Sequence, residues 1–194
     1  MRLTRSAIPP AAAAACLLFF SSAGRAQDAQ HADGGPRPPS DASLVTSALS
    51  AAPPAVSRNA AVIAMSPGGG MRSIRQGTNG FSCMPDNPAT PGPDPMCMDA
   101  GAMEWMMAWI EKRAPPDKTG FIYMLAGGTD ASNTDPYAEK PAPGNHWIRT
   151  GPHVMIVGDP DMLARYPDRA VPDTTQPYVM WAGTPYAHLM IPVR

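Results

Sequence analysis

Two cysteines, Cys83 and Cys97, flank a proline-rich loop. A bond between their sulfur atoms would close a loop of 15 residues. Such a crosslink stabilises a fold by about 3 kcal/mol in the chain-entropy description. A redox-active pair favours the closer Cys-x-x-Cys spacing with one thiol of low pKa, which this sequence lacks. We therefore predict a structural disulfide, and disulfides persist in oxidising compartments outside the cytoplasm.

Two of the four histidines, His153 and His188, lie in apolar segments of strand length. If these strands are neighbours, the imidazoles can meet and, with Asp130 or Asp135 as a carboxylate partner, form a metal or acid–base site. No His-Glu-x-x-His spacing supports such a site. The default interpretation is that each histidine is hydrogen-bonded separately near the edge of a core.

Methionine is abundant, with 14 residues, and thioether and thiolate sulfurs are ligands that select Cu(I). The methionines are scattered rather than grouped in Met-x-x-Met repeats, and methionine fills irregular cores well. Core packing is therefore the preferred interpretation. No cofactor is predicted, and a bound metal, zinc or copper, stands as the alternative.

Two pairs of aspartates lie in loops. Asp130 and Asp135 belong to a polar segment that superficially resembles a calcium-binding loop. The segment lacks the central glycine and the terminal glutamate of the helix–loop–helix version. Asn133 and Asp135 are better explained as turn residues. Asp86 and Asp94, inside the cysteine loop, either bind a cation or accept backbone N–H groups that hold the loop's shape, and we favour the second.

The elements that would position these side chains are short strands and one helix. A hairpin is predicted between residues 71–76 and 81–83, because Asn79-Gly80 favours the positive φ angles of a tight turn. A second hairpin is predicted between 178–181 and 187–191. Further apolar runs of strand length span 61–65, 121–125 and 153–157, and a short helix is predicted between 159 and 166.

The strongest helix signal runs from Asp99 to Arg113. Asp99 can cap its N-terminus, and a basic pair suits its last turn. An apolar stripe that includes Trp105 and Trp109 predicts that the helix is mostly buried. The predicted fold class is α+β: a mainly antiparallel β-sheet with one principal buried helix and one disulfide.

The N-terminus has the three parts of a signal peptide: two arginines, an apolar run over residues 11–20 and a small-residue cleavage site. Cleavage after Ala26 is preferred to cleavage after Ala23. The apolar run is too short to span a bilayer as a helix, so a retained anchor is disfavoured. Lipid attachment at Cys16 is also disfavoured, because this cysteine lies inside the apolar run.

Residues 27–58 are rich in Pro, Ala and Gly and have almost no aromatic side chains, which predicts a disordered spacer. Within it, residues 43–51 can form a short helix capped by Asp41. Residues 59–194 are then predicted to form a single α+β domain.

The net charge of the mature chain limits the classes of partner that it can bind. Removal of residues 1–26 takes away three arginines and leaves 12 basic and 16 acidic residues, a net charge of −4. No basic block is present, so nucleic acid and anionic membrane surfaces are poor candidates. No transmembrane segment is predicted in the mature chain.

Four segments resemble motifs of a group of uncharacterised exported proteins of Gram-negative bacteria: residues 77–86, 95–99, 127–136 and 151–155. The similarity covers residues 60–193. It implies an envelope or secreted protein of unassigned activity, with no catalytic residues to transfer.

Together these features predict an exported domain, periplasmic or secreted, that acts as a binding or envelope-interaction module. The prediction rests on the long loops Met84–Met96 and Gly127–Thr150 and on the lack of a Gly-x-Ser-x-Gly elbow or other recognisable catalytic set. Its partner would be an unidentified small molecule or envelope protein. The alternative is a small metal-binding protein or metal-dependent enzyme centred on His153 and His188, so enzymatic activity is undecided but disfavoured.

Overall fold

The computed structural model describes residues 38–66 and 68–193, and most strands in this part of the chain join one sheet. Its strands are β1 (Ala61–Met65), β2 (Met71–Arg75), β3 (Ser82–Met84), β4 (Met96–Met98), β5 (Gly120–Met124), β8 (His153–Val157), β9 (Tyr178–Met180) and β10 (His188–Pro192). Two further strands, β6 (Ala131–Ser132) and β7 (Trp147–Ile148), pair as a separate ribbon.

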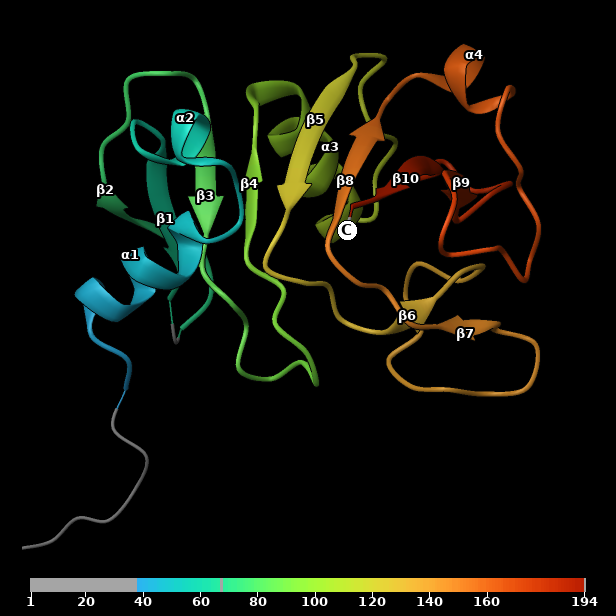
Figure 1. Ribbon diagram of the computed structural model, residues 1–194, viewed down its shortest axis with the longest axis horizontal. Coiled ribbons are helices and arrows are strands. Elements are labelled where there is room, and N and C mark those ends of the chain that lie inside the picture. Colours follow the sequence, from blue (N-terminus) through green and yellow to red (C-terminus); the bar gives the residue numbers. More distant parts are fainter. Residues whose placement is uncertain (1–37, 67, 194) are drawn as a thin grey trace, which may run out of the picture. The chain divides into compact units, whose positions relative to one another are not determined.

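The strand order in the sheet is β2-β1-β3-β4-β5-β8-β10-β9 (Figure 1). Neighbouring strands are antiparallel, except that β1 and β3 run parallel. The α+β class with a mainly antiparallel sheet is therefore confirmed. The order also divides the chain, because β2, β1 and β3 precede β4 in sequence and all strands on its other side follow it.

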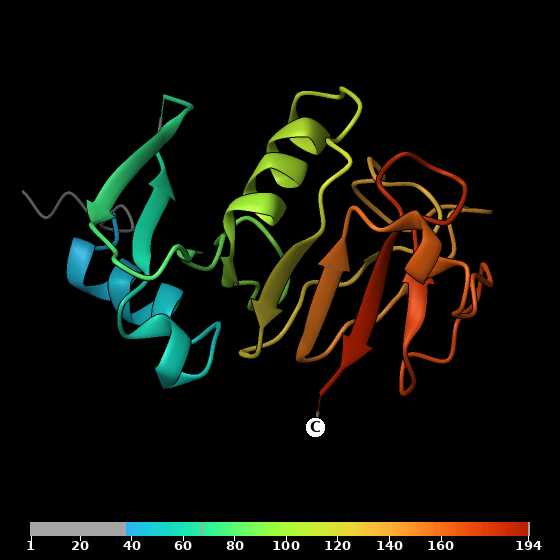
Figure 2. The same ribbon diagram turned by 90° about the horizontal axis from the view of Figure 1, so that it is seen from above.

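Helices cover both faces of this sheet. α1 (Asp41–Leu49) packs over β1 and β3 with α2 (Pro54–Ser57) beside it, and α3 (Ala100–Ile110) packs on the opposite face over β4, β5 and β8 (Figure 2). Successive residues of a strand point to opposite faces. Accordingly, Cys97 of β4 lies in the cluster under α1, whereas Met96 and Met98 lie under α3. We call the two sides the α1 face and the α3 face.

The principal helix was predicted at the right place but too long. Asp99 caps α3 by accepting the N–H of Ala102, and Trp105 is 3% exposed, as the apolar stripe predicts. The helix ends at Ile110 because Lys112 adopts a left-handed φ of 55°. The N–H of Arg113 then turns back to the Ala108 carbonyl, which is the hydrogen bond of a Schellman ending.

The predicted hairpin between residues 71–76 and 81–83 is wrong. β2 pairs instead with β1 through the turn after Met65, where Gly69 and Gly70 both have positive φ. The following segment crosses to the other side of β1, and β3 pairs there in parallel. Asn79 does not serve a hairpin turn, because its amide donates to the Val56 carbonyl and so fixes this crossing to α2.

The domain begins earlier than predicted. Residues 38–58 were assigned to the disordered spacer, yet they form α1 and α2, and Ala48 and Ala51 are fully buried against the sheet. The small alanine side chains allow close approach of helix and sheet, so a segment without aromatic residues still joins the core. The cap of α1 is Ser40, not Asp41. The predicted signal peptide and the rest of the spacer lie outside the described residues.

The later elements follow the prediction closely. β9 and β10 form the expected antiparallel pair, and α4 (Pro160–Leu163) is the short helix, ending earlier than expected. The β6–β7 ribbon covers the α3 face of β9 and β10, where Ala131 and Ile148 pack against Tyr178 and two methionines.

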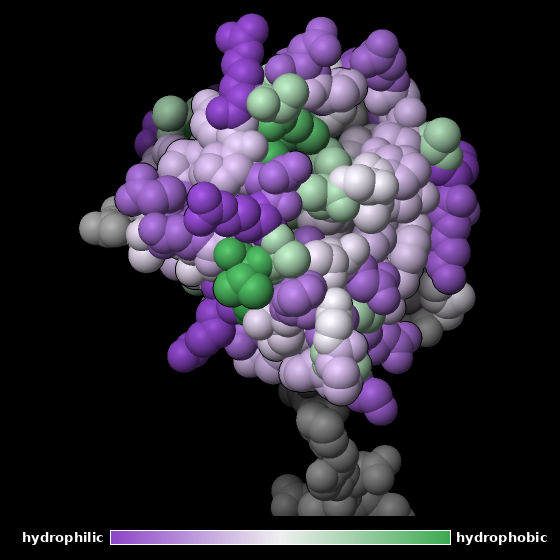
Figure 3. All heavy atoms as spheres, turned by 90° about the vertical axis from the view of Figure 1, so that its right-hand side faces the viewer, coloured by the Kyte–Doolittle hydropathy of each residue, from purple (hydrophilic) through white to green (hydrophobic). Residues whose placement is uncertain are grey.

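The surface beside β9 is mostly hydrophilic, with apolar side chains in small separate groups (Figure 3). Single exposed apolar residues, such as Val171 at 71% exposure, are ordinary on protein surfaces. No helix within residues 38–66 and 68–193 has the length and apolar character needed to cross a membrane.

Candidate functional site

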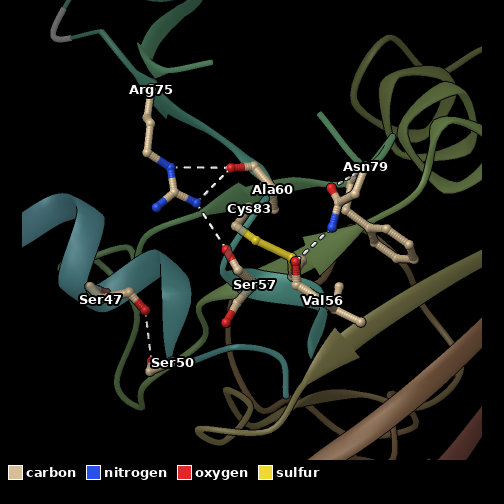
Figure 4. The surroundings of a disulfide bond; sticks show 10 residues. Ser47, Ser50, Val56, Ser57, Ala60, Arg75, Asn79 and Cys83 are labelled. Carbon is tan, nitrogen blue, oxygen red and sulfur yellow. Dashed lines mark hydrogen bonds between the residues drawn. A yellow bond between two sulfur atoms is a disulfide. The ribbon is translucent and has the colours of Figure 1, made fainter. Parts of the chain in front are cut away.

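The predicted disulfide joins β3 to β4. Cys83 and Cys97 are directly opposite each other in the antiparallel pair, their Cα atoms are 3.9 Å apart, and both are fully buried on the α1 face. Near the crosslink, Arg75 donates to the carbonyl oxygens of Ser57 and Ala60 and so ties α2 to the sheet (Figure 4). These surroundings suit a structural bond rather than a redox-active pair, which requires an accessible thiol.

Several loops meet at one end of the sheet, where β3 and β5 finish and β4 and β8 begin. We call it the loop end, and it is the lower edge of the sheet in Figure 1. The loops Met84–Met96 and Gly127–Thr150 both lie here. They are in close contact, because a Cβ atom on Gly127 would lie only 2.9 Å from Pro93.

Asp86 and Asp94 shape the first of these loops. Asp86 accepts the N–H of Asp94, while Asp94 accepts the N–H of Asn87 and the hydroxyl of Thr90. Asp94 is only 8% exposed, and its burial raises the pKa of the carboxyl group. Both carboxylates therefore make the hydrogen bonds expected of residues that hold the loop's shape.

Asp130 and Asp135 lie in the second loop and do not meet. A carboxylate oxygen of Asp130 lies 3.9 Å from the guanidinium of Arg149, and Asp135 accepts the N–H of Tyr137 in a side-chain-stabilised turn. Asn133, predicted to share this turn, is buried instead. Its amide donates to carbonyl oxygens of the segment after α4.

The two histidines of the predicted metal or acid–base site lie in neighbouring strands but at opposite ends of them. His153 is opposite Pro192, and His188 is opposite Val157, a separation of about 13 Å along the strands. Each Nδ1 atom lies within hydrogen-bond distance of the carbonyl oxygen two residues earlier in the chain. The structure therefore matches the separate hydrogen bonding of each histidine.

Metal ligands are not gathered elsewhere in the described residues either. Neither range, 38–66 or 68–193, contains a group of three or more His, Cys, Asp and Glu side chains placed to hold an ion. The cysteine sulfurs are bonded to each other and are not thiolate ligands. Asp130 and Asp135 each have a partner of a different kind, so the structure does not bring the predicted ligand set together.

His188 belongs to an aromatic cluster on the α3 face. Its ring lies edge-on to the indoles of Trp105 and Trp181, which are stacked on one another with centroids 6.2 Å apart. Burial lowers the pKa of His188 to about 4. The other members of the cluster are Trp109, Tyr137 and Tyr186.

Trp181 is in a backbone conformation that bulky side chains rarely adopt, with φ of 57°. It is held there by two hydrogen bonds, from its N–H to the Asn133 carbonyl and from its indole Nε1 to the Ser132 carbonyl. The second loop therefore positions this indole between α3 and β10. The aromatic cluster joins the second loop to the core.

His153 borders a small hollow at the loop end, with a volume of about 150 Å³. The fold brings three stretches to its wall, residues 150–153, 174–175 and 192–193, together with Tyr178 and Met190. His153 is 4% exposed and Tyr178 is 2% exposed. Burial lowers the pKa of His153 and raises the pKa of Tyr178, so both side chains are uncharged at neutral pH.

Among the polar groups of this hollow, only His153 was predicted from the sequence to belong to a site. Tyr178 was predicted only as a strand residue, and no role was predicted for Thr174 or Thr175. Predicting the hollow requires the strand partners of β10. Tyr178 is opposite Met190 of β10, and His153 is opposite Pro192, two residues further along the same strand. The predicted hairpin of β9 with β10 places Tyr178 beside β10, but the sequence does not show that β8 lies on the other side of β10.

Comparison with known proteins adds no relative: no protein-family model, no curated protein and no solved structure matches this chain.

Proposed function

We propose that this chain is an exported domain, periplasmic or secreted, that acts as a binding module through its loop end. Support for export comes from the signal-peptide pattern of the sequence and from the Cys83–Cys97 crosslink, since disulfides form in oxidising compartments. The resemblance to exported Gram-negative proteins points the same way.

The observation that carries the binding proposal is the convergence of loops at one end of a rigid sheet. Loops held by a scaffold are the usual location of binding residues. Here the disulfide closes the first loop, Asp86 and Asp94 fix its path, and the second loop is anchored by Trp181. Such preorganisation reduces the entropy that a loop loses when it binds a partner.

Hydrogen–deuterium exchange tests the binding proposal. The mature protein would be measured with and without the dialysable fraction of a Gram-negative periplasmic extract. Slower exchange is expected in residues 85–95 and 127–152. A Lys118→Ala variant, altered at the opposite end of the sheet, should give the same protection. No protection, or protection confined to other segments, would contradict the proposal.

Export is tested by fractionation of a Gram-negative host that expresses the full chain. The protein is expected outside the cytoplasm, with an intact mass that corresponds to a start at Gln27 and to a closed disulfide. A full-length, reduced product in the cytoplasm would contradict export.

A further inference from the structure

The hollow beside His153 and Tyr178 has chemical properties that narrow its ligand. We propose that it binds an uncharged, ring-sized molecule that carries at least one hydroxyl group. This inference rests on the proposed binding function and specifies its ligand class. Four properties of the wall support it: size, polar groups, lack of charge and an apolar side.

The size of the hollow sets the size of the ligand. Its volume of about 150 Å³ is far larger than the space of one water molecule, which occupies about 30 Å³ in the liquid. A cavity of about this volume accommodates a benzene-sized molecule. A single six-membered ring therefore fits, whereas a peptide or a chain of sugars would have to extend out of the hollow.

The polar side of the wall has hydrogen-bonding groups without protein partners. The Nδ1 atom of His153 lies 2.7 Å from the Gly151 carbonyl oxygen, so the proton resides on Nδ1 and the lone pair of Nε2 is available as an acceptor. Neither the Tyr178 hydroxyl nor the Thr174 hydroxyl makes a hydrogen bond to residues 38–66 or 68–193. A ligand hydroxyl can donate to the first group and accept from the others.

Within residues 38–66 and 68–193, no charged side chain lines the hollow, and this disfavours ionic ligands. The residues that line the hollow are Thr150, Gly151, Pro152, His153, Thr174, Thr175, Tyr178, Met190, Pro192 and Val193. His153 is neutral because protonation would place an unpaired charge in a buried site. A carboxylate or an ammonium group would lose its hydration here without gaining a counter-charge.

Apolar side chains line the hollow beside the polar groups, since Met190 is the strand partner of Tyr178 and Pro192 that of His153. Pro152, Met190, Pro192 and Val193 offer only carbon and sulfur side-chain atoms. Ligand sites commonly combine such an apolar lining with a few polar groups that orient the ligand. In a hydroxylated ring, the carbon atoms can pack against the apolar lining, and the hydroxyl group can bond to the polar groups.

A titration with three probes of equal ring size tests the inference: cyclohexanol, cyclohexanecarboxylate and cyclohexylammonium. Each would be added to the ¹⁵N-labelled mature protein and followed by amide chemical shifts. Cyclohexanol is expected to shift the amides of the non-proline residues in 150–154 and 174–178 and of Val193, and the charged probes are expected to shift them little. Equal or stronger binding of a charged probe would overturn the proposal, as would the absence of shifts in these segments.

Substitutions locate the binding. Tyr178→Phe removes the hydroxyl and keeps the ring, and it is expected to weaken cyclohexanol binding by about three- to tenfold, the value of one hydrogen bond. Thr174→Val, at a partly exposed position, gives a second, nearly isosteric test, and Lys118→Ala is the matched control. Unchanged affinity in both hollow variants, each confirmed as folded by its amide spectrum, would overturn the inference.

The outcome can be separated from that of the binding proposal. If cyclohexanol fails to bind but the periplasmic fraction still protects the loop end, the ligand class is wrong and the binding function stands. If cyclohexanol binds and the periplasmic fraction protects nothing, the ligand class of the hollow stands, and the proposal that the loops Met84–Met96 and Gly127–Thr150 bind a periplasmic partner is wrong.

Discussion

At the scale of single residues, burial is the main cause of the lowered pKa of His153 and His188. His188 is 2% exposed and contacts the indoles of Trp105 and Trp181, and its Nδ1 lies 3.0 Å from the Tyr186 carbonyl oxygen. The main cause of its low pKa is loss of hydration, which outweighs the opposing effect of the hydrogen bond to the Tyr186 carbonyl. Neutral imidazole is thus part of the folded core.

Acid is expected to destabilise the fold through His188. Its pKa is about 4 when folded and about 6.5 when unfolded. Between these values the unfolded chain binds a proton that the folded chain does not, so stability falls as the pH falls through this range. The loss is on the order of 3 kcal/mol. Urea unfolding at several pH values measures it, and a His188→Gln variant should show a shallower pH dependence. An equal slope in both proteins would contradict this assignment.

Asp94 is expected to contribute to stability through the first loop. Asp94→Ala removes the acceptors of the Asn87 N–H and the Thr90 hydroxyl in a largely buried place. A loss of about 1–3 kcal/mol in the free energy of unfolding follows. Asp94→Asn keeps one acceptor oxygen and should lose less. Chemical denaturation compares the two variants, and equal losses would show that these hydrogen bonds are unimportant.

At the scale of elements, sequence patterns correctly predicted the helices and strands whose formation depends on residues close together in the chain. The predictions failed where residues distant in the chain decide which strands pair or which helix is buried. β8 and α3 were found because an apolar run and a helix cap are local signals. The first hairpin was misassigned because two turns offered glycines, and Gly69-Gly70 rather than Asn79-Gly80 closes it. α1 was predicted as a helix but not as part of the core, since its burial depends on the sheet.

Removal of α1 and α2 is expected to destabilise the domain. A chain that begins at Asn59 would expose the apolar cluster under α1, which includes Val62 and the disulfide. A chain that begins at Pro38 retains both helices and serves as the control. Thermal unfolding should occur at a clearly lower temperature for the shorter chain, or the shorter chain should aggregate. Equal unfolding temperatures would mean that residues 38–58 are not part of the core.

At the scale of the whole molecule, the α+β class and the disulfide were predictable, but the arrangement of the loop end was not. The fold class follows from strand and helix patterns, and the crosslink follows from two cysteines in a chain that begins with a signal-peptide pattern. The hollow depends on Tyr178 from β9 and His153 from β8 lying on either side of β10. No local signal carries that strand order.

Loss of the crosslink is expected to weaken the whole domain, because the bond joins strands in the interior of the sheet. Replacing both Cys83 and Cys97 by Ala should lower the free energy of unfolding by about 3 kcal/mol, the entropy of a 15-residue loop. Urea denaturation measures the difference, with the oxidised native protein as reference. An unchanged midpoint would show that the bond is dispensable.

The position of this bond has a consequence for how the strands align. Cys83 and Cys97 face each other across the seam between the earlier and later parts of the chain. A slip of one residue between two strands would turn every side chain to the opposite face, exchanging the layer under α1 with the layer under α3. Once the disulfide has formed, β3 and β4 cannot shift relative to each other. The bond therefore fixes covalently which side chains of the central strands face α1 and which face α3, and the outer strands pair in the register set there.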